Sequence, residues 1–289
     1  MRIIGNTTSQ SNRGVIKKGV VRLNDGSIVE TAAIQELSSG LCKVTPSTQV
    51  GCPVGCLFCA AGKFHRNLTA DEMFAQVRMA RRWFPSAKQF KTSIMGTGEP
   101  TMNQHVFTFM DMLKANSIPF SVSTAAIGRH FERMASFLER YFPSSKLQIS
   151  VHFADSKKRG LYMPGTIKTS LGEVLNRTDI YSQRTGKEVT LNYAVFKGLN
   201  DGEKDISKLL RLVCGRAVIV KLSQANLREV SFPINVRFAP VSLERLTEIG
   251  RVLAAEGVQY KIARSEGREI AAGCGQLAAR YKEGRLVAA

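Results

Sequence analysis

Strand-like and helix-like segments alternate along most of this chain, and the alternation restricts its fold more than any other feature does. Helical patterns separate apolar, β-rich runs at residues 44–50, 90–95, 120–124, 147–152, 189–196, 217–222 and 258–263. Repeated strand–helix units give parallel strands joined by right-handed crossovers, with ligands at the carboxyl ends of the strands. We therefore expect an α/β fold, either a partial (β/α)6 barrel or, as the alternative, a doubly wound sheet.

An antiparallel hairpin is expected before the first of these units. Residues 15–23 and 28–34 are β-rich and flank Asn24-Asp25-Gly26, which is a strong tight-turn signal. The sequence accordingly predicts two regions, an N-terminal β-hairpin extension over residues 1–41 and the partial barrel over residues 42–289.

Composition and charge narrow the classes of function. With 44% hydrophobic and 22% charged residues, the chain has a globular and not a disordered composition. It lacks the roughly 18-residue apolar run of a membrane span and any signal-peptide pattern, so we expect a cytoplasmic protein with no membrane segment. Its 41 Lys and Arg residues against 23 Asp and Glu give a charge of +18, spread along the chain. This excess predicts a basic face for nucleic acid, with an anionic membrane surface as the second choice.

Three cysteines share one loop after the first predicted barrel strand. Cys52, Cys56 and Cys59 have the spacing C-x3-C-x2-C, and clustered thiols in a cytoplasmic chain indicate metal ligands. Zinc would need a fourth ligand, for which His65 is the nearest candidate, whereas a [4Fe–4S] cluster held by three thiolates leaves one iron open. An open iron can chelate S-adenosylmethionine, and an electron from the cluster then cleaves the sulfonium to a 5′-deoxyadenosyl radical. The loop therefore favours an iron–sulfur centre.

A second motif agrees with the cysteine loop. Met95-Gly96-Thr97-Gly98-Glu99-Pro100 follows the next predicted strand. Together the two motifs resemble the radical S-adenosylmethionine (radical SAM) superfamily, which has a GGE-type motif at this place. The resemblance implies that the Glu99 carboxylate binds the ammonium group of S-adenosylmethionine and that the glycines allow a close backbone approach.

More specific segments lie near the two ends of the chain. They are Asp25-Gly26-Ser27-Ile28-Val29-Glu30-Thr31 and Cys274-Gly275-Gln276-Leu277. Supporting segments are Gln49-Val50-Gly51-Cys52, Cys59-Ala60-Ala61-Gly62, Arg66-Asn67-Leu68 and Ile149-Ser150-Val151-His152. From about residue 15 to residue 280 the chain thus resembles the RlmN/Cfr family of RNA adenine C2/C8 methyltransferases.

This resemblance implies a site residue by residue. Cys52, Cys56 and Cys59 would hold the [4Fe–4S] cluster. Contacts to S-adenosylmethionine would come from Gly98, Glu99, Ser123, Ser150, Val151, His152 and Asn226. The implied partners are an RNA substrate (23S rRNA or tRNA) and a reducing electron donor such as flavodoxin or ferredoxin.

The implied reaction uses two further residues at the substrate. Adenine C2 is too weak a nucleophile to attack a methyl sulfonium directly. Instead Cys274 would take a methyl group from one S-adenosylmethionine, and the radical from a second molecule would remove a hydrogen from that methyl group. The carbon radical would add to the adenine ring, Glu30 would accept the ring proton, and a second cysteine would attack the Cys274 sulfur to release the product.

Three features depart from the family pattern. The releasing cysteine would stand at Thr45, so we take Cys42 as the candidate replacement, with Cys214 as a more distant option. The family's Ser-Thr-Ser-Gly reads Ser123-Thr124-Ala125-Ala126 here, and only some fourteen residues precede the hairpin, where the family has a helical domain. Two alternatives stay open for these reasons: a radical enzyme of the same scaffold that modifies a peptide, nucleoside or small molecule, and a non-catalytic RNA-binding protein with a structural metal site.

Overall fold

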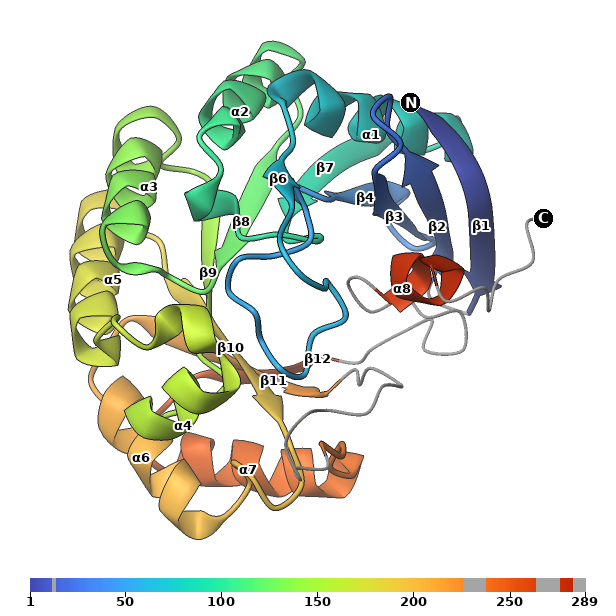
Figure 1. Ribbon diagram of the computed structural model, residues 1–289. Helices are drawn as coiled ribbons and strands as arrows, with labels where there is room; N and C mark the ends of the chain where they lie inside the picture. The colour runs from blue at the N-terminus through green and yellow to red at the C-terminus, as the bar shows by residue number, and fades with distance from the viewer. Residues whose placement is uncertain (12–13, 226–237, 264–275, 283–289) are drawn as a thin grey trace. The chain divides into compact units, whose positions relative to one another are not determined.

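The computed structural model describes residues 1–11, 14–225, 238–263 and 276–282, and from β6 onward each strand is followed by at least one helix (Figure 1). The strands are β1 (Arg2–Gln10), β2 (Gly14–Arg22), β3 (Ile28–Glu36), β4 (Leu41–Pro46), β5 (Gln49–Val50), β6 (Arg66–Asn67), β7 (Gln89–Ile94), β8 (Phe120–Thr124), β9 (Lys146–Ser150), β10 (Val189–Val195), β11 (Val218–Gln224) and β12 (Tyr260–Ala263). The helices are α1 (Ala70–Trp83), η1 (Pro100–Met102), α2 (His105–Ala115), α3 (Gly128–Tyr141), α4 (Ser156–Tyr162), η2 (Pro164–Thr166), α5 (Leu171–Thr185), α6 (Glu203–Val213), α7 (Leu243–Ala255) and α8 (Gln276–Lys282).

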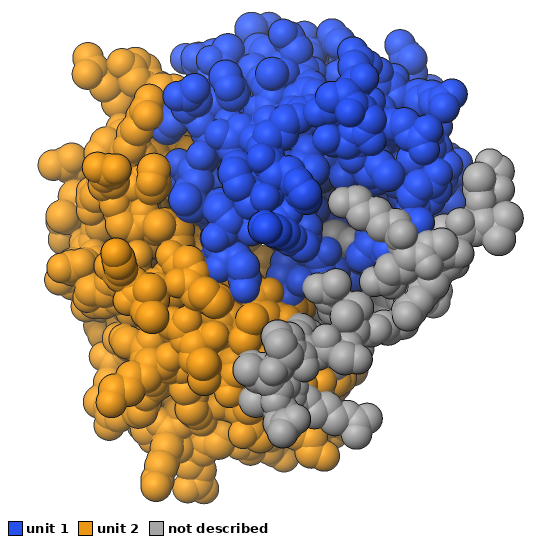
Figure 2. Space-filling view, viewed as in Figure 1, with its two compact units in different colours: residues 1–55, 59–122, 266–289 blue, residues 56–58, 123–265 orange. Residues whose placement is uncertain are grey.

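The chain divides into two compact units, which Figure 2 shows in different colours. The first contains residues 1–55, 59–122 and 266–289, and the second contains residues 56–58 and 123–265. The predicted division after residue 41 falls at the start of β4, inside the first unit, and stays a sequence-based expectation. Among the described helices, none is long and apolar enough to cross a membrane.

The sheet of the first unit has the strand order β1-β2-β3-β4-β7-β8. Neighbouring strands are antiparallel from β1 to β4, and β4, β7 and β8 are parallel. The predicted hairpin is confirmed, since β2 pairs with β3 from Gly14↔Glu36 to Arg22↔Ile28. Strand β1 was not predicted because its sequence, RIIGNTTSQ, is mostly polar and half-exposed; its edge position needs no apolar face.

Side-chain alternation gives the hairpin two different faces. On one face the Thr31 hydroxyl donates to Gln76 Oε1 of α1 at 2.6 Å. Glu30, the preceding residue of β3, points to the opposite face, where α8 packs on β2 and β3 (Figure 1). The C-terminal helix thus covers the hairpin face that carries Glu30.

The second unit contains β9-β10-β11-β12 as parallel neighbours in chain order, without the reversal of order that a doubly wound sheet requires. Helix α3 packs on α5, and α7 packs on β11 and β12. Register aligns Ser150, Asn192, Lys221 and Lys261 as one row across the four strands. Since registered residues of parallel strands share a face, this row is a polar stripe on one face of the sheet.

Helix boundaries agree closely with the sequence pattern where capping signals are present. Thr69 caps α1 with a capping box: its hydroxyl accepts from the Glu72 N–H, and the Glu72 carboxylate accepts from the Thr69 N–H. The short α4 and α8 were missed, because seven-residue helices give too little periodicity to recognise.

Candidate functional site

The cysteine loop is closed at its base by a short antiparallel ladder. Strand β5 pairs with β6, the His65 N–H donates to the Val50 carbonyl at 2.9 Å, and the Cys52 N–H donates to the Gly62 carbonyl at 3.2 Å. Gly51 has φ = +75°, and a Cβ there would lie 1.8 Å from the Lys63 carbonyl oxygen. Only glycine fits at this position, so the residue before Cys52 is fixed by backbone sterics.

The three thiols suit ligation better than nucleophilic attack. Cys52, Cys56 and Cys59 are all partly exposed, and Cys59 Sγ accepts the Ala61 N–H at 3.4 Å. Burial, and to a lesser extent the neighbouring Cys59 and Glu99, raise the pKa of Cys52 to about 12. Such a thiol is protonated at neutral pH, but iron displaces the proton when it binds sulfur.

The donor set therefore fits an iron–sulfur cluster, which takes soft thiolates. Throughout the described part of the chain, no group of three or more His, Cys, Asp or Glu side chains is arranged to hold a single metal ion. His65, the candidate fourth zinc ligand, has an exposed side chain at the end of the loop.

A buried polar network connects this loop to the turn that carries Glu99. The Gln49 amide donates to Asn67 Oδ1 at 2.8 Å and accepts the Glu99 N–H at 2.7 Å. Glu99 Oε1 accepts from the Thr101 hydroxyl at 2.7 Å and from its N–H at 3.2 Å. The Asn103 amide donates to the carbonyls of Thr48 and Leu68, at 2.7 and 2.9 Å. These bonds hold one carboxylate oxygen of Glu99 in place while the side chain is buried.

The glycines of the Glu99 turn serve packing within the protein. Gly98 has φ = +117°, and a Cβ there would lie 2.5 Å from Thr48 Oγ1 and 2.9 Å from the Gln49 nitrogen. A Cβ on Gly96 would lie 2.3 Å from the Pro46 carbonyl oxygen. Both glycines thus allow the segment Pro46–Gln49 to pack closely against the turn.

In the second unit Phe58 and His152 form an aromatic contact. Their ring centroids are 5.4 Å apart with an edge-on geometry, and Phe58 also packs on Phe153, Phe196 and Phe238. Phe58, which directly precedes Cys59, therefore lies in a cluster of aromatic side chains.

His152 itself is a neutral residue in a strained backbone conformation. Its φ of +52° is unusual for a side chain of this size. Burial, with Arg159 and Lys221 nearby, lowers its pKa to about 3. Its Nδ1 accepts the Ala194 N–H at 3.0 Å, so the ring proton lies on Nε2, which is left as a donor.

The predicted contact residues of the second unit lie close together. Ser123 lies near the end of β8 and Ser150 ends β9, as expected for ligand-binding positions. Asn192 joins them through two different groups. Its side-chain amide nitrogen donates to Ser123 Oγ at 3.2 Å, and its backbone carbonyl oxygen accepts the N–H groups of Val151 and His152 at 3.0 and 3.2 Å.

Glu30 is buried between the hairpin and the C-terminal helix. Lys18 Nζ lies 2.9 Å from Glu30 Oε1, and the two side chains are 1% and 4% exposed. Glu30 Oε2 accepts the backbone N–H of Ala278 at 3.2 Å. The carboxylate thus binds the helix that begins two residues after Cys274. Cys274 and Asn226 lie outside the described residues.

The candidates for the releasing thiol lie in unfavourable places. Cys42 is fully buried on β4, and burial raises its pKa to about 12. It shares a face of β4 with Pro46, whose register partner Thr31 faces α1, whereas Thr45 is paired with Ala32 on the face of Glu30. Cys214 is exposed and ends α6 in the second unit.

The stripe across the second unit ends in two lysines. Lys221 donates to Gln148 Oε1 at 2.8 Å, and burial, with Lys261 next to it, lowers the pKa of Lys221 to about 8. Burial and then Lys146 lower the pKa of Lys261 as well, while Glu188 raises it. Lys221, which is partly desolvated, and the exposed Lys261 beside it are two neighbouring cations that make this part of the sheet attractive to anions.

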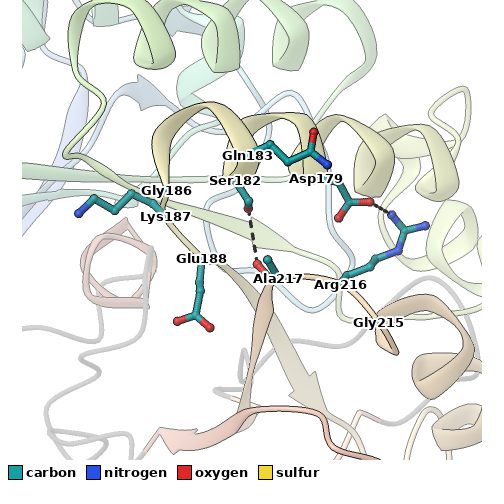
Figure 3. A pocket seen from close by; sticks show the side chains of 9 residues that line it. All are labelled: Asp179, Ser182, Gln183, Gly186, Lys187, Glu188, Gly215, Arg216 and Ala217. Carbon is teal, nitrogen blue, oxygen red and sulfur yellow. Dashed lines mark hydrogen bonds and ion pairs between the residues drawn. The ribbon is translucent and has the colours of Figure 1, made fainter.

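A cavity of about 450 Å³ lies elsewhere in the second unit (Figure 3). The end of α5 and the loops before β10 and β11 form it, and Arg216 there binds Asp179. None of its lining residues is a predicted site residue. It opens at the amino ends of the strands, where ligand sites of α/β folds are uncommon.

Sequence reasoning missed several residues that hold the predicted site residues in position. Gln49, Asn103 and Lys18 were not assigned roles, and Gln49 stood only within a quoted motif. Their signal is a polar residue where alternation predicts an apolar one, which the sequence shows but cannot connect to a distant partner.

Comparison with known proteins agrees with this fold. The family model described as the radical SAM superfamily matches residues 47–210. A solved structure of a radical SAM methyltransferase from Sphaerobacter thermophilus is 29% identical and covers 96% of this chain and 81% of that chain, with a TM-score of 0.85. The S-adenosylmethionine-bound SuiB of Streptococcus suis, 13% identical over 78% of this chain and 50% of that chain, has a TM-score of 0.56 and shares the fold. These matches define the class as radical SAM enzymes.

Relatives in sequence are more specific. A probable dual-specificity RNA methyltransferase RlmN of Chlorobium phaeobacteroides is 34% identical over 92% of this chain and 74% of its own length. The corresponding protein of Thermotoga neapolitana is 31% identical over 90% of this chain and 75% of its own length. The chain belongs to the RlmN-like family of the radical SAM superfamily. The expected α/β fold is confirmed, and membership implies a [4Fe–4S] cluster and S-adenosylmethionine as cofactors.

Gly98→Ala should damage the site through the protein's own packing. The new Cβ would collide with Thr48 and with the Gln49 backbone, and the positive φ would add strain, so we expect a loss of about 2–4 kcal/mol in unfolding free energy. Urea denaturation measures the loss. Gly186→Ala is the control, because Gly186 has φ = +65° with open space around it. An equal loss in both variants would contradict the packing argument.

Lys221→Met should stabilise the protein at pH 7. The pKa of Lys221, about 8 in the folded chain, lies below the lysine value of about 10.4, so the unfolded state binds more protons between these pH values and wild-type stability rises with pH there. The variant lacks this rise, and its advantage should shrink between pH 7 and pH 10. Urea unfolding at both pH values tests this, with exposed Lys168→Met as the control. A pH-independent difference would contradict the assignment.

Proposed function

We propose that this protein methylates an adenine ring carbon, C2 or C8, in rRNA or tRNA through a methyl group carried on Cys274. The relatives are named as probable RNA methyltransferases, and the motifs for cluster and cofactor are present here. The bound cluster and S-adenosylmethionine would supply the radical that activates the carried methyl group. We further propose a cytoplasmic setting and a flavodoxin- or ferredoxin-like electron donor.

The observation that carries the proposal is the bond between Glu30 and Ala278. The proposed proton acceptor lies in the hairpin, and the proposed methyl carrier, Cys274, lies 244 residues later in the sequence. Glu30 accepts the N–H of a residue only four positions beyond Cys274, in a helix that packs on the same face of the hairpin. A fold that joins the two ends of the chain at these positions supports their joint role.

Charge supports a polyanionic substrate. The chain carries a net charge of +18. In the polar stripe of the second unit Lys221 and Lys261 lie side by side, and burial lowers the pKa of both. A phosphodiester near them would relieve their mutual repulsion and would replace lost hydration.

Within this proposal the chain's own residues have separate tasks. Gln49 holds the Glu99 backbone N–H and Thr101 holds its carboxylate, which would bind the ammonium group of S-adenosylmethionine. His152, neutral with a proton on Nε2, would offer the bound cofactor a hydrogen-bond donor without a charge. Lys18 Nζ, 2.9 Å from Glu30 Oε1, holds that carboxylate in a fixed position between the hairpin and α8.

A second candidate function is a radical enzyme of the same scaffold with a different target, such as a peptide, nucleoside or small molecule. The observation that favours it is Thr45, which shares the Glu30 face of the sheet at the place of the expected releasing thiol. A hydroxyl cannot form the disulfide that would free Cys274, so product release must differ from the proposed family chemistry.

RNA methylation is tested directly with anaerobically reconstituted protein, dithionite, S-adenosylmethionine and rRNA or tRNA transcripts. We expect 2-methyl- or 8-methyladenosine in nuclease digests analysed by mass spectrometry. Cys274→Ala should lower the yield by at least about 100-fold because the methyl carrier is lost, whereas the exposed Cys214→Ala should not. Production of 5′-deoxyadenosine with every RNA left unmodified would instead support the second candidate.

Product release gives a separate prediction. Because Cys42 is buried on the face opposite Glu30, Cys42→Ala should leave turnover per folded molecule unchanged. Thr45→Cys should raise turnover, since it adds a thiol on the Glu30 face. The measurement is the amount of Cys274–RNA adduct, detected by mass spectrometry of the digested protein. Adduct that accumulates only in Cys42→Ala would identify Cys42 as the releasing thiol after all.

A further inference from the structure

Asn192 contains a buried acceptor whose hydrogen-bonding capacity is unused. Its side chain is 8% exposed at the middle of β10. The amide nitrogen donates to Ser123 Oγ at 3.2 Å, but no donor among the described residues reaches its Oδ1. An unsatisfied buried acceptor destabilises a folded protein, so its retention calls for an explanation.

The surroundings of Asn192 indicate a ligand. Its neighbours are Ser123, Ser150, Val151 and His152, which are four of the five residues of this unit to which the family resemblance gives contacts with S-adenosylmethionine. Asn192 is the register partner of Ser150 on the face that carries the polar stripe, and its backbone carbonyl accepts the N–H groups of Val151 and His152. The backbone of Asn192 therefore fixes that segment, while its side chain presents the Oδ1 acceptor beside it.

We propose that Asn192 Oδ1 accepts a hydrogen bond from the adenosyl half of S-adenosylmethionine, from a ribose hydroxyl or the adenine amino group. The cofactor's remaining strong donor, its ammonium group, is charged and suits a carboxylate better than a neutral amide oxygen. A neutral amide oxygen suits the neutral O–H and N–H donors of the nucleoside. Asn192 is thus a cofactor-positioning residue in addition to those that the motifs identify.

The contact makes a different prediction for stability and for affinity. Asn192→Leu removes the acceptor and fills a similar volume, so the unligated protein should be as stable as wild type or more stable, because an unsatisfied polar atom is gone. The same variant should bind S-adenosylmethionine about tenfold more weakly. A purely structural asparagine would show the opposite pattern, with lower stability and unchanged affinity.

Equilibrium dialysis tests this on the anaerobically reconstituted, unreduced protein without RNA, so its outcome is independent of the RNA methylation proposal. The probes are S-adenosylmethionine and 5′-methylthioadenosine, which keeps the nucleoside and lacks the ammonium group. We expect Asn192→Leu to weaken both by about tenfold and Asn192→Asp, which keeps an acceptor, to weaken them by less than about threefold. Melting temperatures without ligand are recorded for each variant.

Thr190→Val is the matched control, since Thr190 lies two residues earlier on the same face of β10 and is equally exposed at 8%. Its affinity for both probes should stay at the wild-type value. The proposal fails if Asn192→Leu binds both probes like wild type, or if it loses S-adenosylmethionine but keeps 5′-methylthioadenosine.

Discussion

The amide of Gln49 joins the parts of the first unit on which the chemistry depends. With both polar atoms engaged in a fully buried environment, it links Asn67, after the cysteine loop, to the Glu99 backbone in the following turn. Hydrogen bonds of this kind are stronger in a low dielectric, and leaving one unmade costs more there than in water. The loop that presents Cys52 and the turn that presents Glu99 are therefore held to the same strand end and keep a common geometry.

Period-two alternation along the strands then separates packing from chemistry. In the hairpin Thr31 faces α1 while Glu30 faces α8, and in β4 the side chains of Cys42 and Thr45 go to opposite faces. A shift of register by one residue would move every one of these side chains to the wrong face. The same rule produces the stripe of the second unit, where an amide and two lysines occupy one face because the registers of β10, β11 and β12 coincide.

Buried polar groups in this protein act mostly as supports for other groups. Lys18 pairs with Glu30, the Asn103 amide satisfies the carbonyls of Thr48 and Leu68, and the Asn192 amide donates to the Ser123 hydroxyl. Each such group would be costly in an apolar core, and each is retained where it orients a residue that the family motifs mark. Conserving the geometry of a reactive centre thus requires more residues than the reaction itself uses.

The sequence by itself determined the strand–helix order, the hairpin turn and the motif residues Cys52 and Glu99, because short-range periodicity and spacing carry that information. It did not determine the edge strand β1 or the short helix α8, whose local signals are weak. Only the tertiary structure decided that Ala278 meets Glu30 and that Cys42 turns away from Glu30. Those facts depend on strand register and on contacts between residues far apart in the chain, and no local pattern encodes them.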